Sequence, residues 1–178
     1  DYWNNNYQDD IYFRNGEPEE TKGYCTDVFF DEAISFINKN KENPFLCFLS
    51  LNAPHSPFNV PKEYYELYEN ESDLLESQKR FYGMITNIDD NFGRLHQHVE
   101  NLGILDNTII IFTTDNGTSN GYKYSRKDKK WLGFNAGMRG TKTSEYDGGH
   151  RVPFIIKWKK GGLFGGHNYS GLSAHVDM

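Results

Sequence analysis

Residues 108–117 read Thr108-Ile-Ile-Ile-Phe-Thr-Thr-Asp115-Asn116-Gly117, a β-branched apolar run that ends on an acid, an amide and a glycine. A run that is apolar on both faces predicts an interior strand of a parallel sheet. In an open α/β sheet, such a strand presents the residues after its carboxyl end to the ligand crevice. We therefore expect Asp115 and Asn116 to lie at a binding site, on a tight turn that Gly117 permits.

Asp115 and Asn116 offer an anionic and a neutral oxygen donor side by side. Such a pair suits a hard divalent cation, Ca²⁺ or Mg²⁺, better than a soft metal. The alternative interpretation is a solvated turn in which these side chains bind their own backbone. The neighbouring segments decide which interpretation is favoured.

A second apolar run, residues 45–51, predicts another buried strand, which leads into Asn52-Ala-Pro-His55-Ser-Pro-Phe58. If this run is also a parallel strand, His55 faces the same crevice as Asp115. The prolines on both sides of His55 restrict the backbone, which indicates a loop of fixed shape. A histidine titrates near neutral pH, so His55 is a candidate general acid. The alternative is a surface histidine or one that is hydrogen-bonded in the core.

A third segment, residues 140–153, combines glycines and hydroxyls with Lys142 and precedes a third predicted strand, the apolar run at 154–158. Glycines allow the backbone to approach a ligand closely, and the compact Lys142 ammonium suits a tetrahedral anion. A solvated lysine is the alternative interpretation. Taken alone, this segment is only weakly similar to a phosphate-binding loop.

Three motifs occur in a defined order: Asn-Ala-Pro-His55-x-Pro-Phe, then Thr-Thr-Asp115-Asn116-Gly117, then Gly-x-Lys142 with the Tyr-Asp-Gly-Gly-His-Arg-Val-Pro tail of residues 146–153. In this order they resemble the type I sulfatases, the arylsulfatase branch of the alkaline-phosphatase superfamily. The resemblance implies an α/β fold with a mostly parallel sheet and flanking helices. It also implies a sulfuric ester hydrolase that acts on sulfated sugars or aryl compounds.

The resemblance assigns a role to each matched residue. Asp115 and Asn116 would be ligands of a divalent metal, Ca²⁺ first and Mg²⁺ as the alternative. Lys142 would hold a sulfate oxygen, and His55 would contact the sulfate and protonate the leaving alcohol. The nucleophile of the family is the hydrated aldehyde of formylglycine, which is made from a cysteine within Cys-x-Pro/Ala-Ser-Arg. Stabilisation of the sulfuryl oxygens by the metal and the cations is the largest expected contribution.

The chain also departs from the family pattern. Cys25 and Cys47 are followed by Thr-Asp-Val and Phe-Leu-Ser, so neither lies in the maturation motif. The family's early Asp-Asp metal pair and the second lysine and histidine of its sulfate pocket have no counterpart. We therefore expect residues 1–178 to be the central part of one sulfatase catalytic domain, inactive alone, without the N-terminal formylglycine segment and the C-terminal subdomain. Exposed apolar surface and self-association are expected consequences.

The overall composition excludes some classes of function. The formal charge of −6 at pH 7 argues against general nucleic-acid binding. No apolar run reaches the roughly 18 residues of a membrane span. The family resemblance implies a sulfated small molecule or glycan as the partner, and a periplasmic, lysosomal or secreted location.

Residues 122–131 carry a local positive charge although the whole chain is negative. Basic and aromatic side chains lie close together there, shortly after the Asp115 turn. They form either a solvated loop or a wall that attracts an anionic sulfated sugar and stacks on its ring, since loops at strand ends set specificity. The residues concerned are Lys123, Arg126, Lys127, Lys129 and Lys130, with Tyr122, Tyr124 and Trp131.

The remaining pattern alternates as expected for an α/β domain. Asn15-Gly16 predicts the turn of a hairpin. Helices are predicted at about 27–38, at 61–68 and, from an apolar stripe that steps by four and three, at 81–102 before Gly103. The acids and histidines on the polar side of the last helix indicate a solvated face instead of a metal site.

Two other functions stay open at this point. A phosphodiesterase or phosphonate hydrolase of the same superfamily usually carries Asp-His-Gly at the corresponding turn, so Asn116 counts against it. A non-catalytic, glycan-binding remnant would keep the fold without the nucleophile. A Cys-x-Pro/Ala-Ser-Arg motif upstream would distinguish an active sulfatase from such a remnant.

Overall fold

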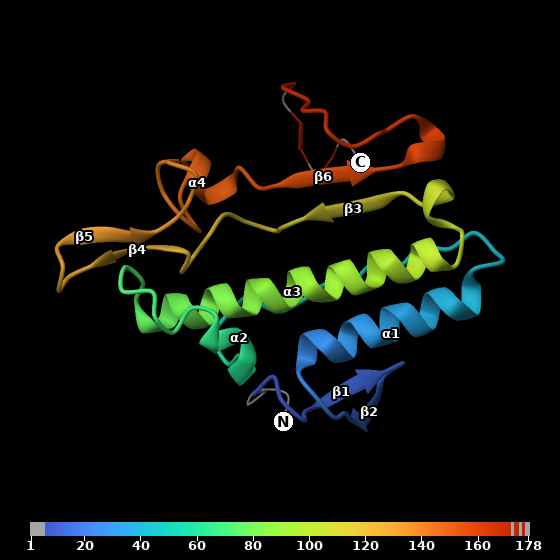
Figure 1. Cartoon of the computed structure of the whole chain (residues 1–178), viewed down its shortest axis with the longest axis horizontal. Coiled ribbons are helices and arrows are strands. Elements are labelled where there is room, and N and C mark those ends of the chain that lie inside the picture. Colours follow the sequence, from blue (N-terminus) through green and yellow to red (C-terminus); the bar gives the residue numbers. More distant parts are fainter. Residues whose placement is uncertain (1–5, 172, 175, 177–178) are drawn as a thin grey trace.

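The computed structural model describes residues 6–171, 173–174 and 176. Its longest elements are two helices, α1 (Cys25–Asn40) and α3 (Glu76–Asn101), which pack side by side. The strands β3 (Ile110–Thr113) and β6 (Phe154–Lys157) lie along the other side of α3 (Figure 1). Phe92 of α3 and Phe112 of β3 contact each other there, with ring centroids 5.9 Å apart. Helices thus flank strands, which confirms the α/β class.

The N-terminal hairpin is confirmed: β1 (Ile11–Arg14) pairs antiparallel with β2 (Glu17–Glu20). The turn residues Asn15 and Gly16 both have positive φ angles, 53° and 92°, as the Asn-Gly pair predicts for a two-residue hairpin turn. Tyr12 of β1 and Phe29 of α1 have ring centroids 4.9 Å apart. This contact attaches the hairpin to the helical layer.

The predicted helices are confirmed, but their ends differ from the prediction. α1 is longer than predicted at both ends, α2 (Lys62–Glu66) is shorter, and α3 begins at Glu76 instead of residue 81. The early start of α3 depends on Gln78, whose Oε1 accepts a hydrogen bond from the Leu75 backbone N–H at 2.9 Å. An apolar stripe cannot reveal this turn, because Gln78 is polar although it is fully buried. Within the described residues, no helix combines the length and apolar character needed to cross a membrane.

The direction of strand pairing differs from the prediction. β3 pairs antiparallel with β6, and every ladder among the described residues is antiparallel. An apolar run on both faces indicates burial, and burial is compatible with either direction. The predicted parallel strand at 108–114, and with it a mostly parallel sheet, is therefore wrong for the described part of the chain. The carboxyl end of β3 nevertheless leads directly into Asp115.

The predicted buried strand at residues 45–51 is wrong for the described chain, because this segment forms no strand and none of its residues is buried. Its side chains alternate: Phe45 contacts Phe36 of α1 with ring centroids 6.1 Å apart, whereas Leu46 and Phe48 are exposed. The expected exposed apolar surface is therefore present. It includes these two side chains and, on or beside β3 and β6, Ile109, Ile111, Phe154 and Ile155.

Residues 122–133 form a further hairpin, in which β4 (Tyr122–Ser125) pairs antiparallel with β5 (Lys130–Gly133). Its root is held by the first turns of α3: Tyr82 Oη donates to Gly121 O at 2.6 Å, and Gln78 Nε2 donates to Leu132 O at 2.9 Å. Figure 1 shows this hairpin and the short helix α4 (Asp147–His150) at the same end of the molecule as the carboxyl end of β3. Two 3₁₀ turns, η1 (Leu105–Asn107) and η2 (Lys159–Gly161), complete the described elements.

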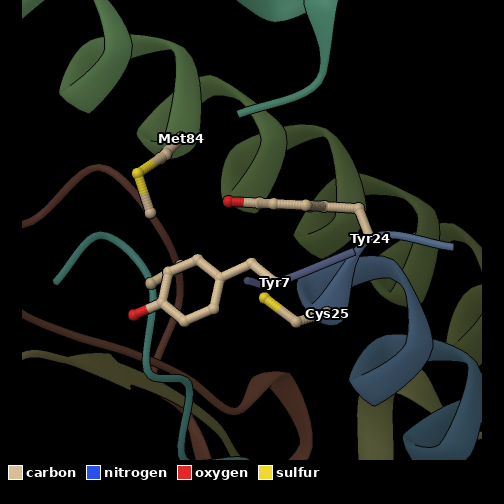
Figure 2. Close-up of a cluster of buried hydrophobic side chains, with 5 residues drawn as sticks. Tyr7, Tyr24, Cys25 and Met84 are labelled. Atoms are coloured by element: carbon tan, nitrogen blue, oxygen red, sulfur yellow. The ribbon is translucent and has the colours of Figure 1, made fainter. Parts of the chain in front are cut away.

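A small core connects the N-terminal segment, both long helices and the loop that carries His55. Figure 2 shows Cys25 at the start of α1 and Met84 of α3 beside the ring of Tyr7. Cys25 and Met84 are fully buried, and Ala53 belongs to the same cluster. Because Ala53 lies two residues before His55, close packing in this core fixes the start of the His55 loop.

Candidate functional site

The turn after β3 carries the predicted metal ligands at the surface. Asn116 Nδ2 donates to Gly117 O at 2.8 Å, and Thr114 Oγ1 donates to Asn116 O at 3.2 Å. The amide nitrogen thus binds backbone, as the solvated-turn alternative predicts, while the amide oxygen has no protein donor in the described chain. The exposed Asp115 carboxylate has no hydrogen bond or ion pair there either. Two hard oxygen donors are therefore available to a ligand.

The loop that carries Lys142 lies directly against this turn. The Gly117 backbone N–H donates to Gly149 O at 2.9 Å, and the Lys142 backbone N–H donates to Thr118 O at 2.9 Å. A Cβ on Gly117 would lie only 2.0 Å from Gly148 O, so only glycine permits this approach. The structure therefore brings together two of the three predicted motifs. We call the group formed by Asp115, Asn116 and Lys142 the loop corner.

The Lys142 loop has its own supports. Asn135, which is buried, donates from Nδ2 to Met138 O at 2.7 Å and to Gly140 O at 3.1 Å. The Gly148 backbone N–H closes the loop on Arg139 O at 2.8 Å. The half-buried Lys142 side chain makes no ion pair or hydrogen bond with the described residues. A fixed backbone therefore holds an ammonium group that has no acceptor in this part of the protein.

His55 lies in an exposed loop, with Nδ1 2.8 Å from Ser56 O. A carbonyl oxygen only accepts, so Nδ1 carries a proton and Nε2 is the ring atom left for another group. The Tyr7 hydroxyl donates to His55 O at 3.2 Å and to Ser56 O at 3.3 Å. Burial raises the pKa of Tyr7, so this hydroxyl stays protonated as a donor.

Sequence reasoning missed the supporting role of Tyr7 and Tyr24. Tyr24 Oη donates to Asn59 O at 2.9 Å, so both tyrosines hold the segment that follows His55. Each bond joins residues more than thirty positions apart. In the sequence, these two tyrosines stand on either side of the β1–β2 hairpin, before α1. That position does not identify their hydrogen-bond partners.

The His55 loop reaches the loop corner through α3. Phe58, beyond His55, contacts Phe81 with ring centroids 6.0 Å apart. The next residue of α3, Tyr82, binds Gly121 O, which follows the Asp115 turn. Among the described residues, no hydrogen bond joins the His55 loop directly to the Asp115 turn or the Lys142 loop. The common role of His55, Asp115 and Lys142 in one site therefore stays a prediction.

The described residues contain no group of three or more His, Cys, Asp or Glu side chains that could hold a metal ion. Asp115 and Asn116 provide an incomplete set of ligands, since Ca²⁺ takes about six to eight oxygens. The histidines on the polar side of α3 have protein partners: Lys157 Nζ donates to His96 Nε2 at 2.9 Å, and His98 Nε2 lies 2.9 Å from Asn38 Oδ1. They are not arranged around a metal.

Neither cysteine is placed as a nucleophile. Burial raises the pKa of the Cys25 thiol to about 11, so this group is a neutral core residue at physiological pH. Burial also raises the pKa of Cys47, in the extended segment before the His55 loop. Only a thiolate is strongly nucleophilic.

Comparison with known proteins gives a consistent result. A family model described as Sulfatase matches residues 1–178. The sequence is 31% identical over 176 residues to the uncharacterized sulfatase YdeN of Escherichia coli K12, which covers 97% of this chain and 29% of that relative. It is 31% identical over 135 residues to an N-acetylgalactosamine-6-O-sulfatase of Bacteroides thetaiotaomicron, covering 74% of this chain and 25% of that protein.

Solved structures agree with the sequence comparison. The crystal structure of Ps i-CgsB superposes with a TM-score of 0.69 at 31% identity, over 82% of this chain and 30% of that one. The structure of the same protein in complex with k-i-k-neocarrahexaose gives a TM-score of 0.67 at 31% identity, with the same coverage of both chains. The chain thus spans less than a third of the length of these proteins.

Proposed function

Because this chain belongs to the sulfatase family, we propose that the complete protein that carries it hydrolyses sulfate esters. The main support is the pair of backbone hydrogen bonds from Gly117 to Gly149 and from Lys142 to Thr118. They join a turn that carries two oxygen donors to a loop that carries an unpaired ammonium. A cation held by the oxygens and the ammonium beside it would together stabilise negative charge on a sulfuryl group.

The proposed cofactor is a divalent cation, Ca²⁺ first and Mg²⁺ as the alternative. The residues fit such a cation, because the Asp115 carboxylate and the Asn116 amide oxygen are hard donors without a protein partner in the described chain. When bound, the cation would supply positive charge to the sulfuryl oxygens. The remaining ligands and the formylglycine would be contributed by other parts of the protein.

Lys142 and His55 would perform the two remaining tasks. The Lys142 ammonium would contact one sulfuryl oxygen, where its charge would stabilise the negative charge that develops as the S–O bond breaks. His55 would donate a proton to the leaving alcohol oxygen. Because Nδ1 of His55 is held by Ser56 O, Nε2 would be the atom that transfers the proton.

We propose sulfated sugars as the substrate class. The support comes from relatives whose names specify sulfated sugars, such as the N-acetylgalactosamine-6-O-sulfatase, and from Ps i-CgsB, which was solved in complex with k-i-k-neocarrahexaose. No observation favours the phosphodiesterase alternative, and Asn116 supplies oxygen where that branch has a nitrogen ligand. A small aryl sulfate would test the chemistry independently of sugar recognition.

The test is sulfate release by the complete protein, with Lys142→Ala as the variant and Lys159→Ala as the matched control. Lys159 pairs with Asp106 at 2.8 Å, away from the loop corner. Lys142→Ala should lower kcat for an aryl sulfate by about 10²–10⁴, while Lys159→Ala should not change it. Equal turnover in Lys142→Ala and the parent would contradict the assigned role. Faster cleavage of an aryl phosphodiester than of the aryl sulfate would contradict the reaction.

A further inference from the structure

We propose that the exposed face of the β4–β5 hairpin binds a sulfated oligosaccharide of several units, next to the site at which one sulfate is removed. The inference rests on the proposed sulfatase function and extends it, because it names a second contact surface for the substrate. The hairpin platform means the face formed by Tyr122, Tyr124 and Trp131. Figure 1 shows that the hairpin projects from the molecule at the end where β3 and α4 meet.

The three aromatic rings share one face of the hairpin. Tyr124 is directly opposite Trp131 in the antiparallel register, and Tyr122 lies two residues before Tyr124 on the same side. Tyr122 stacks on Trp131, with ring centroids 4.9 Å apart and an interplanar angle of 15°. Tyr124 meets Trp131 edge to face at 5.8 Å. The rings therefore hold one another in a fixed arrangement without a further layer of protein.

The opposite face of the hairpin supplies its attachment. Leu132 is buried, and Gln78 of α3 donates to its carbonyl. Ser125 is also buried, and its Oγ donates to Asp128 Oδ2 at 2.6 Å, which closes the turn. Trp131 and Tyr124 nevertheless remain 53% and 46% exposed. Folding of the described chain thus uses one face of the hairpin and leaves a contiguous aromatic face for binding.

Charge identifies the occupant of the platform. The turn between the strands carries Arg126, Lys127 and Lys129, none of which has an ion pair or hydrogen bond among the described residues. The net charge of the chain is −6, so this turn is a local positive region on a negative protein. A polyanion would be repelled by most of the surface and attracted to the turn.

The combination of rings and cations matches a sulfated sugar. The apolar C–H face of a pyranose packs on an aromatic ring, and guanidinium or ammonium groups bind the sulfate oxygens around it. An apolar segment of protein would use the rings but would leave the cations of the turn without partners. A nucleic acid is disfavoured by the overall negative charge.

The hairpin platform is also physically connected to the loop corner. Thr118 accepts the Lys142 backbone N–H at its carbonyl, and its Oγ1 accepts the Gly121 N–H at 3.0 Å at the root of the hairpin. Tyr124 is three residues beyond Gly121, a span of at most about 10 Å along an extended strand. A substrate of several sugar units would therefore reach both places, whereas a small aryl sulfate would contact only the loop corner.

The experiment compares two substrates in the complete protein. Trp131→Ala should raise KM for a sulfated carrageenan hexasaccharide about 10-fold or more, while kcat/KM for an aryl sulfate stays at the parent value. The matched control is Phe164→Ala, which removes an aromatic side chain of similar exposure, 59%, beyond β6. It should change neither value. An equal loss on both substrates, or a lowered Tm with unchanged KM, would overturn the proposal and indicate that protein covers the rings.

Direct binding separates failure of this proposal from failure of the proposed function. Calorimetry with the sulfated hexasaccharide and its desulfated counterpart needs no turnover, so it remains informative even if no ester is cleaved. The triple variant Arg126→Ser, Lys127→Ser and Lys129→Ser should weaken binding of the sulfated form and reduce its salt dependence. Equal affinity for both sugars in the parent protein would overturn the charge argument.

Discussion

An aspartate lies beside one or two asparagines at two places in the molecule, and its carboxylate has different partners at each. In the helical seam between α1 and α3, formed by Asp27, Asn87 and Asn91, Asp27 Oδ1 accepts hydrogen bonds from both amides at 2.9 and 2.6 Å. In the loop corner, the Asp115 carboxylate has no partner among the described residues. One acid is satisfied by the fold, and the other has no partner in the described chain and is the proposed metal ligand.

We expect this difference to separate the charges that stabilise the fold from those that serve the proposed reaction. Asn87 is fully buried and Asn91 nearly so, and an unsatisfied buried donor costs about 1–3 kcal/mol. Asp115 is exposed, so its removal leaves no buried group without a partner. Changes in the helical seam should therefore lower stability, and changes in the loop corner should lower activity.

The largest expected effect is that of Asp115→Ala in the complete protein. Removing the anionic oxygen donor should abolish stoichiometric metal binding and lower kcat by about 10²–10⁴, because the charge that stabilises the sulfuryl oxygens is lost. Elemental analysis of bound calcium and steady-state kinetics measure the two effects. When a chelator keeps both proteins free of metal, the free energy of unfolding of Asp115→Ala should match that of the parent within about 0.5 kcal/mol.

Asp106→Ala is the control for Asp115→Ala, because it removes another exposed acid, whose ion-pair partner is Lys159. It should retain both metal and turnover. Equal calcium content in Asp115→Ala and the parent would refute the metal assignment. Full turnover in a calcium-free Asp115→Ala protein would show that the reaction does not need this ligand.

The next effect concerns the contact between the two loops of the corner. In Gly117→Ala, the new Cβ would lie 2.0 Å from Gly148 O, so the loops must move apart. We expect kcat to fall by about 10- to 100-fold, since a displacement of about 1 Å misaligns the reacting groups. Overpacking should also lower stability by about 1–3 kcal/mol. Kinetics and urea unfolding measure both.

Gly93→Ala provides a matched control within α3. A Cβ at this exposed helical position meets nothing within 4 Å. The variant should gain about 0.5–1 kcal/mol of stability, because alanine is the better helix former, and its kcat should not change. An unaltered kcat in Gly117→Ala would mean that the approach of the two loops does not position the reacting groups.

Local sequence signals predicted much of this fold. Asn15-Gly16 specifies a turn with two positive φ angles, and the apolar stripe of α3 follows helical periodicity. The family resemblance assigns Asp115 and Lys142 to one sulfate site, and the structure brings the segments that carry them into contact. These features are encoded by residues that are close together in the chain or by motifs that match a family pattern. One sequence is therefore enough to predict them.

Other features depend on partners that one sequence does not identify. The run at 108–114 predicts burial, but the antiparallel direction of β3 is set by its pairing with β6. The β4–β5 turn has no glycine, and Lys129 adopts a φ of 52°, so no residue type indicates that turn. The Tyr7 bond to the His55 loop spans 48 positions of the chain. Such contacts become visible only in three dimensions.

In the helical seam, Asp27→Ala should lower the free energy of unfolding by about 1–3 kcal/mol, because the buried Asn87 amide loses its acceptor and the Asn91 amide loses one of its two acceptors. Turnover of the folded protein should equal that of the parent. Asp31→Ala is the control, since its ion pair with Arg94 is exposed and contributes less than about 1 kcal/mol. If Asp27→Ala were as stable as Asp31→Ala, the seam would not be the stabilising counterpart of the loop corner.

The smallest expected effect tests whether the core of Figure 2 influences the His55 loop. Tyr7→Phe keeps the buried ring but removes the hydroxyl that donates to His55 O and Ser56 O. We expect kcat to fall about 2- to 10-fold with little change in KM, since a hydrogen bond of about 0.5–1.5 kcal/mol no longer positions the loop. Tyr24→Phe removes a comparable bond, to Asn59 O, and should lower stability without lowering kcat. Equal kcat values in the two variants would show that Tyr7 supports the fold and does not position His55.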